Sequence, residues 1–299
     1  MCSKQLAVLV LIASSLLGQA SAIDIAQETR AVEQWRTERV TNLTSATGWL
    51  TLVGLYWLQE GENTFGRSKS NTLQLDHATL PATLGTFVRQ GNRVSFTARP
   101  TSAVTHEGKP IRTIDMTSDA NAAPTTLTAG TVQFFLIDRA GRLGIRVRDT
   151  AHAARTEFTG IDYFPISSAW VIDAKFEAHK PTRRIAIVNV LGMTEQMISP
   201  GALVFQKDGR QYRLDTVLEV PDDDELFIMF ADATTARETY GAGRYLYVPL
   251  PSNGRITVDF NKAYNPPCAF NDFATCPLPP QQNRLPLRVE AGEKKYSAR

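Results

Sequence analysis

Turn signals recur about every ten residues from Gly48 onward, between short apolar and aromatic runs, a spacing typical of β-sandwiches and β-barrels. Three of these signals have the form of hairpin turns: Gln90-Gly91-Asn92, Arg139-Ala140-Gly141 and Lys207-Asp208-Gly209. Each lies between two strand-like segments, and its glycine readily adopts the positive φ that tight hairpin turns use. Because this spacing leaves little chain for long helices, we predict a mainly β protein.

One helix is expected before the first strand. Residues 24–45 carry apolar side chains at helical spacing, and Gly48 is a natural stop. The apolar positions are Ile25, Val32, Trp35 and Leu43. Packing against a sheet is the common cause of such periodicity, so we expect this role for the helix rather than partner binding.

The first 22 residues have the pattern of a secretory signal peptide. Lys4 precedes an apolar run over residues 6–17, and Ala20-Ser21-Ala22 then gives the small-x-small pattern of a cleavage site. The apolar run is shorter than the roughly 20 residues that span a bilayer. We predict cleavage after Ala22, a periplasmic or secreted mature protein, and no membrane span after cleavage.

Composition excludes several classes of protein. The chain has 299 residues and is 43% hydrophobic and 21% charged, which is too apolar for a disordered protein. The net charge of +2 shows no nucleic-acid footprint, so no nucleic acid is expected among its partners. Signatures of P-loop enzymes, zinc proteases, α/β-hydrolases and dithiol oxidoreductases are absent, and we predict no cofactor and no metal.

The candidate functional residues lie in the C-terminal third. A strand ending in Ile256, Val258 and Phe260 points these side chains to one face, so Asp259 and Asn261 face the other. The loop beyond is rich in proline, and rigid polar loops often carry ligand sites. We predict a site for a small molecule, glycan or peptide, with ligand-binding residues Tyr240, Arg244, Asn261, Tyr264, Asn265 and Asn283.

A second hypothesis is a hydrolase in which Asp232 and Asp259 are catalytic. Two neighbouring carboxylates raise one pKa, so that one can act as acid and the other as base. The same residues can instead form a buried polar network, with an Asp capping a turn, Arg244 paired to an Asp, and Tyr hydroxyls bonded to the backbone. A third hypothesis is a structural protein of the cell envelope without a small ligand.

Cys268 and Cys276 lie in the proline-rich loop. An oxidising compartment favours a disulfide between them, and closing so short a loop contributes about 2–3 kcal/mol to stability. The alternatives are a catalytic thiol or half of a metal site. A thiol nucleophile needs a base and a metal needs further ligands, and the nearby sequence supplies no histidine for either.

Several long blocks point to a known family. They occupy residues 48–57, 65–66, 230–244, 258–270, 274–280, 283–287 and 291–294. With these blocks the chain, from roughly residue 35 onward, resembles the bacterial and archaeal proteins grouped as domain-of-unknown-function family 1684. This resemblance implies kinship and no particular activity.

Residues 61–96 carry a second resemblance. Gly66-Arg67-Ser68 and Asn71-x-Leu73-x-Leu75 are similar to the opening strands of a forkhead-associated sandwich. That family reads phosphothreonine with an Arg, a Ser and a later Ser-x-x-His, but the later segment here is Pro81-Ala82-Thr83-Leu84. The resemblance therefore implies the fold and not the phosphothreonine site.

Together these observations predict the organisation of the chain. We expect a signal peptide over 1–22, an N-terminal helix over 23–47, a forkhead-associated-like β-sandwich over 48–165, and a second β subdomain over 166–299. The second subdomain is predicted to be an antiparallel β layer or barrel that carries the proline-rich C-terminal loops.

Overall fold

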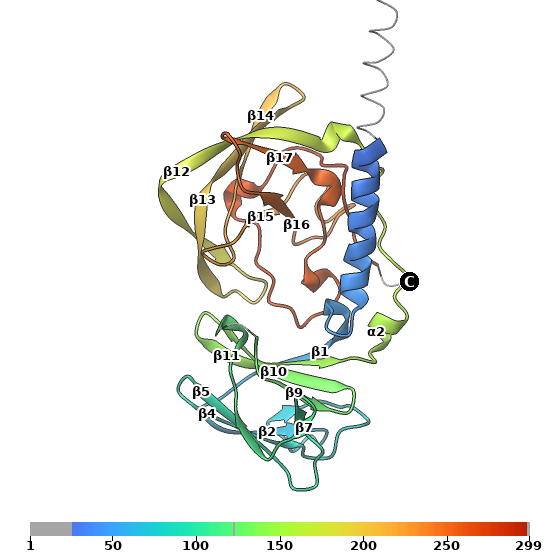
Figure 1. The fold of residues 1–299 in the computed structure, drawn as a ribbon, viewed down its shortest axis with the longest axis vertical. Coiled ribbons are helices and arrows are strands. Elements are labelled where there is room, and N and C mark those ends of the chain that lie inside the picture. The colour runs from blue at the N-terminus through green and yellow to red at the C-terminus, as the bar shows by residue number, and fades with distance from the viewer. Residues whose placement is uncertain (1–25, 122, 298–299) are drawn as a thin grey trace, which may run out of the picture.

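The computed structural model describes residues 26–297 except residue 122, so the predicted signal peptide lies outside the described residues. Figure 1 shows two β units, with the N-terminal helix running along the side of the C-terminal unit. The described part of this helix covers residues 26–44. The prediction of a mainly β fold with an N-terminal helix is confirmed. Among the described residues, no helix is both long and apolar enough to cross a membrane.

The first unit is a sandwich of two sheets. The larger sheet has the order β1 (Leu52–Trp57), β11 (Arg142–Asp149), β10 (Val132–Arg139), β9 (Thr126–Ala129), β6 (Thr105–His106) and β7 (Lys109–Pro110). The smaller sheet has the order β3 (Leu73–Gln74), β2 (Gly61–Gly66), β4 (Gly85–Gln90), β5 (Arg93–Ala98) and β8 (Thr113–Asp115). Alternate side chains of each strand face the opposite sheet, which brings together the rings of Phe65, Phe87, Phe96 and Phe134.

The three predicted hairpin turns are present. The residues that close them are paired as Gln90 with Arg93, Arg139 with Arg142, and Lys207 with Arg210. In the second turn, Ala140 and Gly141 have φ values of 54° and 81°. Two successive positive φ values are typical of a type I′ turn, whose twist matches that of the strands it joins.

The C-terminal unit contains two further sheets. One has the order β14 (Arg210–Asp215), β13 (Thr194–Lys207), β12 (Val171–Val188) and β17 (Arg255–Asp259). The other is a ribbon of β15 (Glu225–Phe230) and β16 (Arg244–Pro249). Both are antiparallel, as predicted, and the described strands form separate layers rather than a closed barrel. Their shared core includes Phe205, Phe230 and Phe260.

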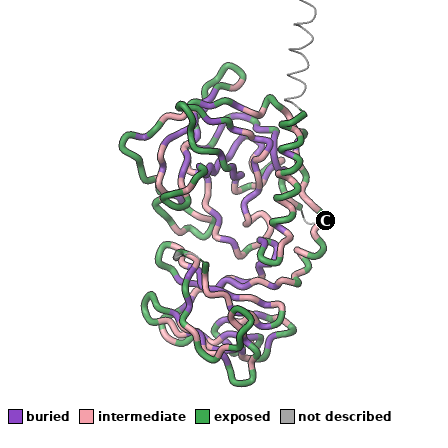
Figure 2. The backbone as a smooth tube through the Cα atoms, in the orientation of Figure 1, coloured by how far each residue is buried: buried purple, intermediate pink, exposed green. Residues whose placement is uncertain are grey.

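Short helices lie before, between and after these strands. They are η1 (Trp49–Thr51), η2 (Asp119–Asn121), α2 (Ala153–Thr156), η3 (Ser168–Trp170), η4 (Phe260–Lys262), η5 (Pro267–Ala269) and η6 (Gln281–Asn283). After β17 the tail folds back over the unit, and the backbone N–H of Leu285 donates to the carbonyl of Ala231 at 2.8 Å. Figure 2 shows the buried backbone gathered inside the two units, with exposed turns around them.

The N-terminal helix packs on irregular segments of the C-terminal unit. Val32 and Leu43 are buried, as the helical spacing predicts. The guanidinium of Arg36 donates to the carbonyl of Phe164 at 3.0 Å, and that of Arg39 donates to the buried Glu293 at 2.9 Å. The contacts of the two arginines are thus with loop and tail segments, where a sheet was expected. This anchoring holds Trp35 and Arg39 at the edge of the site described below.

Candidate functional site

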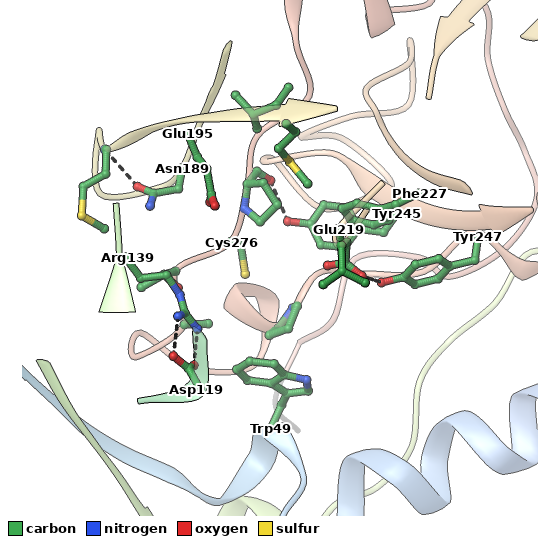
Figure 3. Close-up of a pocket in the computed structure, with 18 of the residues that line it drawn as sticks. Trp49, Asp119, Arg139, Asn189, Glu195, Glu219, Phe227, Tyr245, Tyr247 and Cys276 are labelled. Carbon is green, nitrogen blue, oxygen red and sulfur yellow. Dashed lines mark hydrogen bonds and ion pairs between the residues drawn. The ribbon is translucent and has the colours of Figure 1, made fainter. Parts of the chain in front are cut away.

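A cavity of about 740 Å³ lies where the N-terminal helix, the β10–β11 hairpin and the C-terminal unit meet (Figure 3). Its aromatic lining consists of Trp35, Trp49, Phe227, Tyr245, Tyr247 and Tyr264. Its charged lining consists of Glu38, Arg39, Asp119, Asp138, Arg139, Glu195 and Glu219. The volume is in the range of pockets for small ligands, about 300–1,000 Å³.

The β15–β16 ribbon provides the centre of the aromatic lining because its two faces differ. Ile228 and Phe230 point into the main core, whereas Phe227, one position along, belongs to a separate cluster that borders the cavity. Phe227 and Tyr247 are paired in register, and their rings stack with centroids 5.0 Å apart. Tyr245 meets Phe227 edge to face at 4.9 Å. Cross-strand packing thus fixes three adjacent rings.

Two further rings come from distant parts of the chain. Tyr264 lies beyond β17, and its backbone N–H and C=O bond to Tyr245 at 2.9 and 2.8 Å. Its ring stacks with Tyr247 at 6.2 Å and lies 6.3 Å from Trp35 of the N-terminal helix. We refer to Trp35, Phe227, Tyr245, Tyr247 and Tyr264 as the aromatic wall.

The tyrosines of the aromatic wall are uncharged at neutral pH. Burial raises the pKa of Tyr245, Tyr247 and Tyr264 well above the ordinary value for tyrosine. The hydroxyl of Tyr245 donates to the carbonyl of Pro277 at 2.6 Å, and that of Tyr247 donates to the carboxylate of Glu219. These bonds orient the two rings; Tyr247 is exposed, whereas Tyr245 and its neighbour Phe227 are buried.

Glu219 is the carboxylate next to the aromatic wall. The preceding segment is fixed on both sides, since Val217 pairs with Phe227 and Leu218 pairs with Ile198. The side chain is exposed to the cavity, but the surrounding protein displaces water from it and raises its pKa. Asp223 also raises the pKa, against the lowering effect of the Tyr247 hydrogen bond. Glu219 is therefore a carboxylate whose charge is poorly compensated.

The opposite side of the cavity joins the two units. The guanidinium of Arg139 donates two bonds to Asp119, at 2.7 and 2.9 Å. Arg139 and Arg146 both donate to the hydroxyl of Thr275, each at 3.1 Å. Burial, and then the neighbouring charge of Arg139, lower the pKa of Arg146 to about 10. One threonine of the C-terminal loop thus accepts hydrogen bonds from two arginines of the first unit.

Asp232 does not reach the cavity. Its side chain is fully buried, and its oxygens accept bonds from the Thr234 hydroxyl, the Val289 backbone and Arg244. Arg244 is itself buried and also donates to the carbonyl of Ala291. A carboxylate without exposed surface cannot meet a substrate, so the predicted catalytic role of Asp232 is corrected to that of a structural ion pair.

Asp259 has a different structural role. Its Oδ1 accepts from the backbone N–H of Asn261 at 3.0 Å and caps η4. The side chain of Asn261 also binds Ser167, donating to its carbonyl at 2.9 Å. The partners of Asp259 are thus distinct from those of Asp232. The buried polar network that the sequence left open as the alternative to a carboxylate pair accounts for both.

Most other predicted ligand-binding residues also hold loops together. Tyr240 donates its hydroxyl to the carbonyl of Cys268, and Asn265 donates to the carbonyl of Lys294, both at 2.8 Å. The side chain of Asn283 bridges the carbonyls of Asp215 and Met229. Asn261, Asn265 and Asn283 are fully buried. Among the predicted ligand-binding residues, Tyr264 is the one that lines the cavity.

The two cysteines lie beside each other at the cavity. Both are free thiols in the structure, and the backbone N–H of Cys268 donates to the Sγ of Cys276 at 3.1 Å. The interaction with Cys268 and burial raise the pKa of Cys276, which lines the cavity. The disulfide remains a prediction. Among the described residues, no three His, Cys, Asp or Glu side chains are grouped to hold a metal ion.

Sequence reasoning missed most of the aromatic wall and Glu219. Residues 226–230 and 245–248 have the apolar and aromatic pattern of strands, which by itself predicts no site. A detectable signal is the alternation Tyr245-x-Tyr247 beside aliphatic Leu246 and Val248, since it gives one strand an aliphatic face and a polar-tipped aromatic face. Glu219 lies just before the acidic run over residues 222–225, and such a run is typical of a solvated turn, so the sequence does not single Glu219 out as a site residue.

The fold and the cavity define a two-unit β protein with an aromatic-lined pocket where its parts meet. The chain belongs to the family described as "Protein of unknown function (DUF1684)", whose model matches residues 156–294. The predicted kinship is thus confirmed, although the blocks at 48–57 and 65–66 lie outside the matched range. Phe227, Tyr245, Tyr247 and Tyr264 lie within it.

Among solved structures, the chain is similar to an uncharacterized protein of Haloarcula marismortui determined by NMR. The two are 32% identical, and the match covers 47% of this chain and 78% of that one, with a TM-score of 0.40. Two FHA domains also match, one crystallised as part of a complex of FhaA and one studied for phosphothreonine-dependent interactions. Each is 18% identical and covers 33% of this chain and 96% of its own, with TM-scores of 0.22 and 0.21. No curated protein in the comparison matches the chain.

Proposed function

We propose that this protein is exported and binds a small molecule, a glycan or a short peptide in the cavity beside the aromatic wall. The observation that carries the proposal is the grouping of five aromatic rings with the carboxylate of Glu219 around one volume of about 740 Å³. Binding pockets combine a mainly apolar lining with a few oriented polar groups. The Tyr247 hydroxyl and the Glu219 carboxylate are such groups.

The geometry favours binding over the other two hypotheses. A hydrolase that uses Asp232 lacks access to substrate, because that carboxylate is fully buried. A purely structural role predicts that the C-terminal loops are buried and hydrogen-bonded throughout, with no opening between them. Tyr264, Cys276 and Pro277 instead line an open volume, which supports a binding role for these loops.

Export is part of the proposal and is supported by Lys4, the apolar run over residues 6–17 and Ala20-Ser21-Ala22. In an oxidising compartment, a disulfide between Cys268 and Cys276 fixes the loop that borders the cavity. Mass measurement of the secreted protein tests both points. We expect a mature chain that begins at Ile23, and an uncleaved chain contradicts export. We also expect no alkylated thiol before reduction, and two labelled thiols contradict the disulfide.

Tryptophan emission offers a direct test of ligand binding. Two of the four tryptophans, Trp35 and Trp49, line the cavity. In the double variant Trp57→Phe/Trp170→Phe, emission reports on these two alone. We expect members of a library of sugars, amino acids, dipeptides and amines to change this emission saturably. The proposal fails if none does, or if the responding compounds act equally on the Tyr247→Ala variant.

A further inference from the structure

We propose that the ligand of this cavity is an organic cation, an amine or a quaternary ammonium compound, whose charge lies between the aromatic wall and the carboxylate of Glu219. This inference rests on the proposed function and specifies the chemical class of the ligand. It follows from three observations: an excess of carboxylates around the cavity, the position of Glu219, and the exposed aromatic ring of Tyr247 beside it.

The charges that line the cavity do not balance. Both lining arginines are already paired, Arg139 with Asp119 at 2.7 Å and Arg39 with the buried Glu293 at 2.9 Å. The remaining lining carboxylates belong to Glu38, Asp138, Glu195 and Glu219. None of the four forms an ion pair with any residue in the described part of the chain. The lining therefore carries an excess of formal negative charge, which favours a cation over an anion.

Glu219 and Glu195 present this charge to the interior of the cavity. Figure 3 shows their carboxylates directed into it, one from the ribbon side and the other from β13. Glu219 accepts a hydrogen bond from the Tyr247 hydroxyl, which fixes the carboxylate at the edge of the ring. The protein around Glu219 disfavours its charged form, and a cation beside it reverses that effect.

The aromatic wall supplies the second element of cation recognition. The face of an aromatic ring carries negative potential, and a ring within about 6 Å of an ammonium group attracts it. The wall already binds a cation at one end, since the guanidinium of Arg39 lies 4.6 Å from the centre of the Tyr264 ring. The adjacent Tyr247 is 38% exposed and stacks on Phe227 and Tyr264. Tyr247 and Glu219 thus place an aromatic ring and a carboxylate side by side, and both kinds of group attract ammonium ions.

Two pairs of matched probes separate charge from shape. Choline is compared with 3,3-dimethylbutan-1-ol, its neutral carbon analogue, and 2-phenylethylammonium is compared with 2-phenylethanol. Dissociation constants are measured by NMR titration of the full mature chain. We expect at least one cation to bind about tenfold or more tightly than its neutral analogue, a preference within the range of cation–π and ion-pair contacts.

The variant Glu219→Gln assigns the preference to this carboxylate. It keeps the hydrogen-bond acceptor for Tyr247 and removes the charge, so the ratio of the two dissociation constants is expected to fall towards one. The matched control is Glu225→Gln, which removes an exposed carboxylate outside the cavity lining and is expected to leave the ratio unchanged. Thermal unfolding of both variants shows whether each is folded.

The outcomes distinguish this inference from the proposed function. If the neutral analogues bind as tightly as the cations, the proposed ligand class is wrong, but the proposed binding function of the cavity still stands. The same holds if the tryptophan assay finds only neutral or anionic ligands. A cation preference that survives Glu219→Gln overturns the role of Glu219. If neither these probes nor the library bind, both the inference and the proposed function fail.

Discussion

The buried guanidinium of Arg244 donates to the carboxylate of Asp232 at 3.2 Å, and both side chains are nearly or wholly inaccessible to solvent. The same guanidinium also donates to the carbonyls of Val289 and Ala291. This ion pair therefore joins the end of the β15–β16 ribbon to the C-terminal tail. It stabilises the tail on which the cavity depends, without contacting a ligand.

Replacing Asp232 is expected to destabilise the protein more than replacing Asp259. Asp232→Ala leaves the charge of Arg244 buried without a partner, which costs about 3–5 kcal/mol in free energy of unfolding. Asp259→Ala removes the cap of η4 and costs about 0.5–2 kcal/mol. Urea unfolding of both variants measures the difference. Similar, small losses in the two variants contradict the structural role of Asp232.

The hydroxyl of Thr275 is one of the contacts between the two units. Thr275→Val keeps the shape of the side chain and leaves Arg139 and Arg146 without this acceptor, which is expected to cost about 1–3 kcal/mol. The control is Thr257→Val on β17, an exposed position where a change within about 0.5 kcal/mol is expected. Chemical unfolding measures both. Equal stability of the two variants shows that the bonds to Thr275 do not hold the units together.

Glu219 makes stability depend on pH in a predictable direction. Its pKa is higher in the folded than in the unfolded protein, so between those two values the folded protein binds more protons. The free energy of unfolding should therefore fall as pH rises through this window. Glu219→Gln removes that contribution and gives a flatter dependence, whereas Glu225→Gln does not. Urea unfolding at a series of pH values tests this; parallel curves for wild type and Glu219→Gln refute it.

A disulfide between Cys268 and Cys276 is expected to have a measurable effect on the stability of the protein. Oxidation of Cys268 and Cys276 closes a short loop and is expected to stabilise the protein by about 2–3 kcal/mol over the reduced form. In the double variant Cys268→Ser/Cys276→Ser, unfolding should no longer respond to reductant. Unfolding of the wild type with and without reductant gives the answer. Identical curves indicate that no such bond forms.

Local chemistry made much of the fold predictable. The hairpins at Gly91, Gly141 and Gly209 were predicted because turn geometry is encoded in a few adjacent residues. The N-terminal helix was predicted from periodicity, and the burial of Val32 and Leu43 confirms its apolar face. Which surface each element packs on could not be predicted, because it depends on contacts between residues far apart in sequence.

The site was harder to predict for the same reason. Tyr264, a predicted ligand-binding residue, lines the cavity, but its neighbours Tyr247 and Trp35 come from a ribbon strand and from the N-terminal helix. Asp232 and Arg244 have the residue types of an active site and form a buried ion pair instead. Residue type alone does not separate these two roles, since both place polar groups in a buried environment. The solvent accessibility of the polar groups distinguishes an active site from a buried ion pair, and this accessibility is known only once the chain is folded.

The most direct test of the binding cavity is the affinity of the best ligand for two aromatic variants. Tyr247→Ala removes a ring of the aromatic wall, and Tyr296→Ala removes a half-buried ring outside the cavity that packs on Phe158 and Phe270. Calorimetric titration of wild type and both variants is the measurement. We predict that Tyr247→Ala weakens binding at least about tenfold, or roughly 1.4 kcal/mol, while Tyr296→Ala leaves it unchanged. Equal affinity for wild type and Tyr247→Ala contradicts the account.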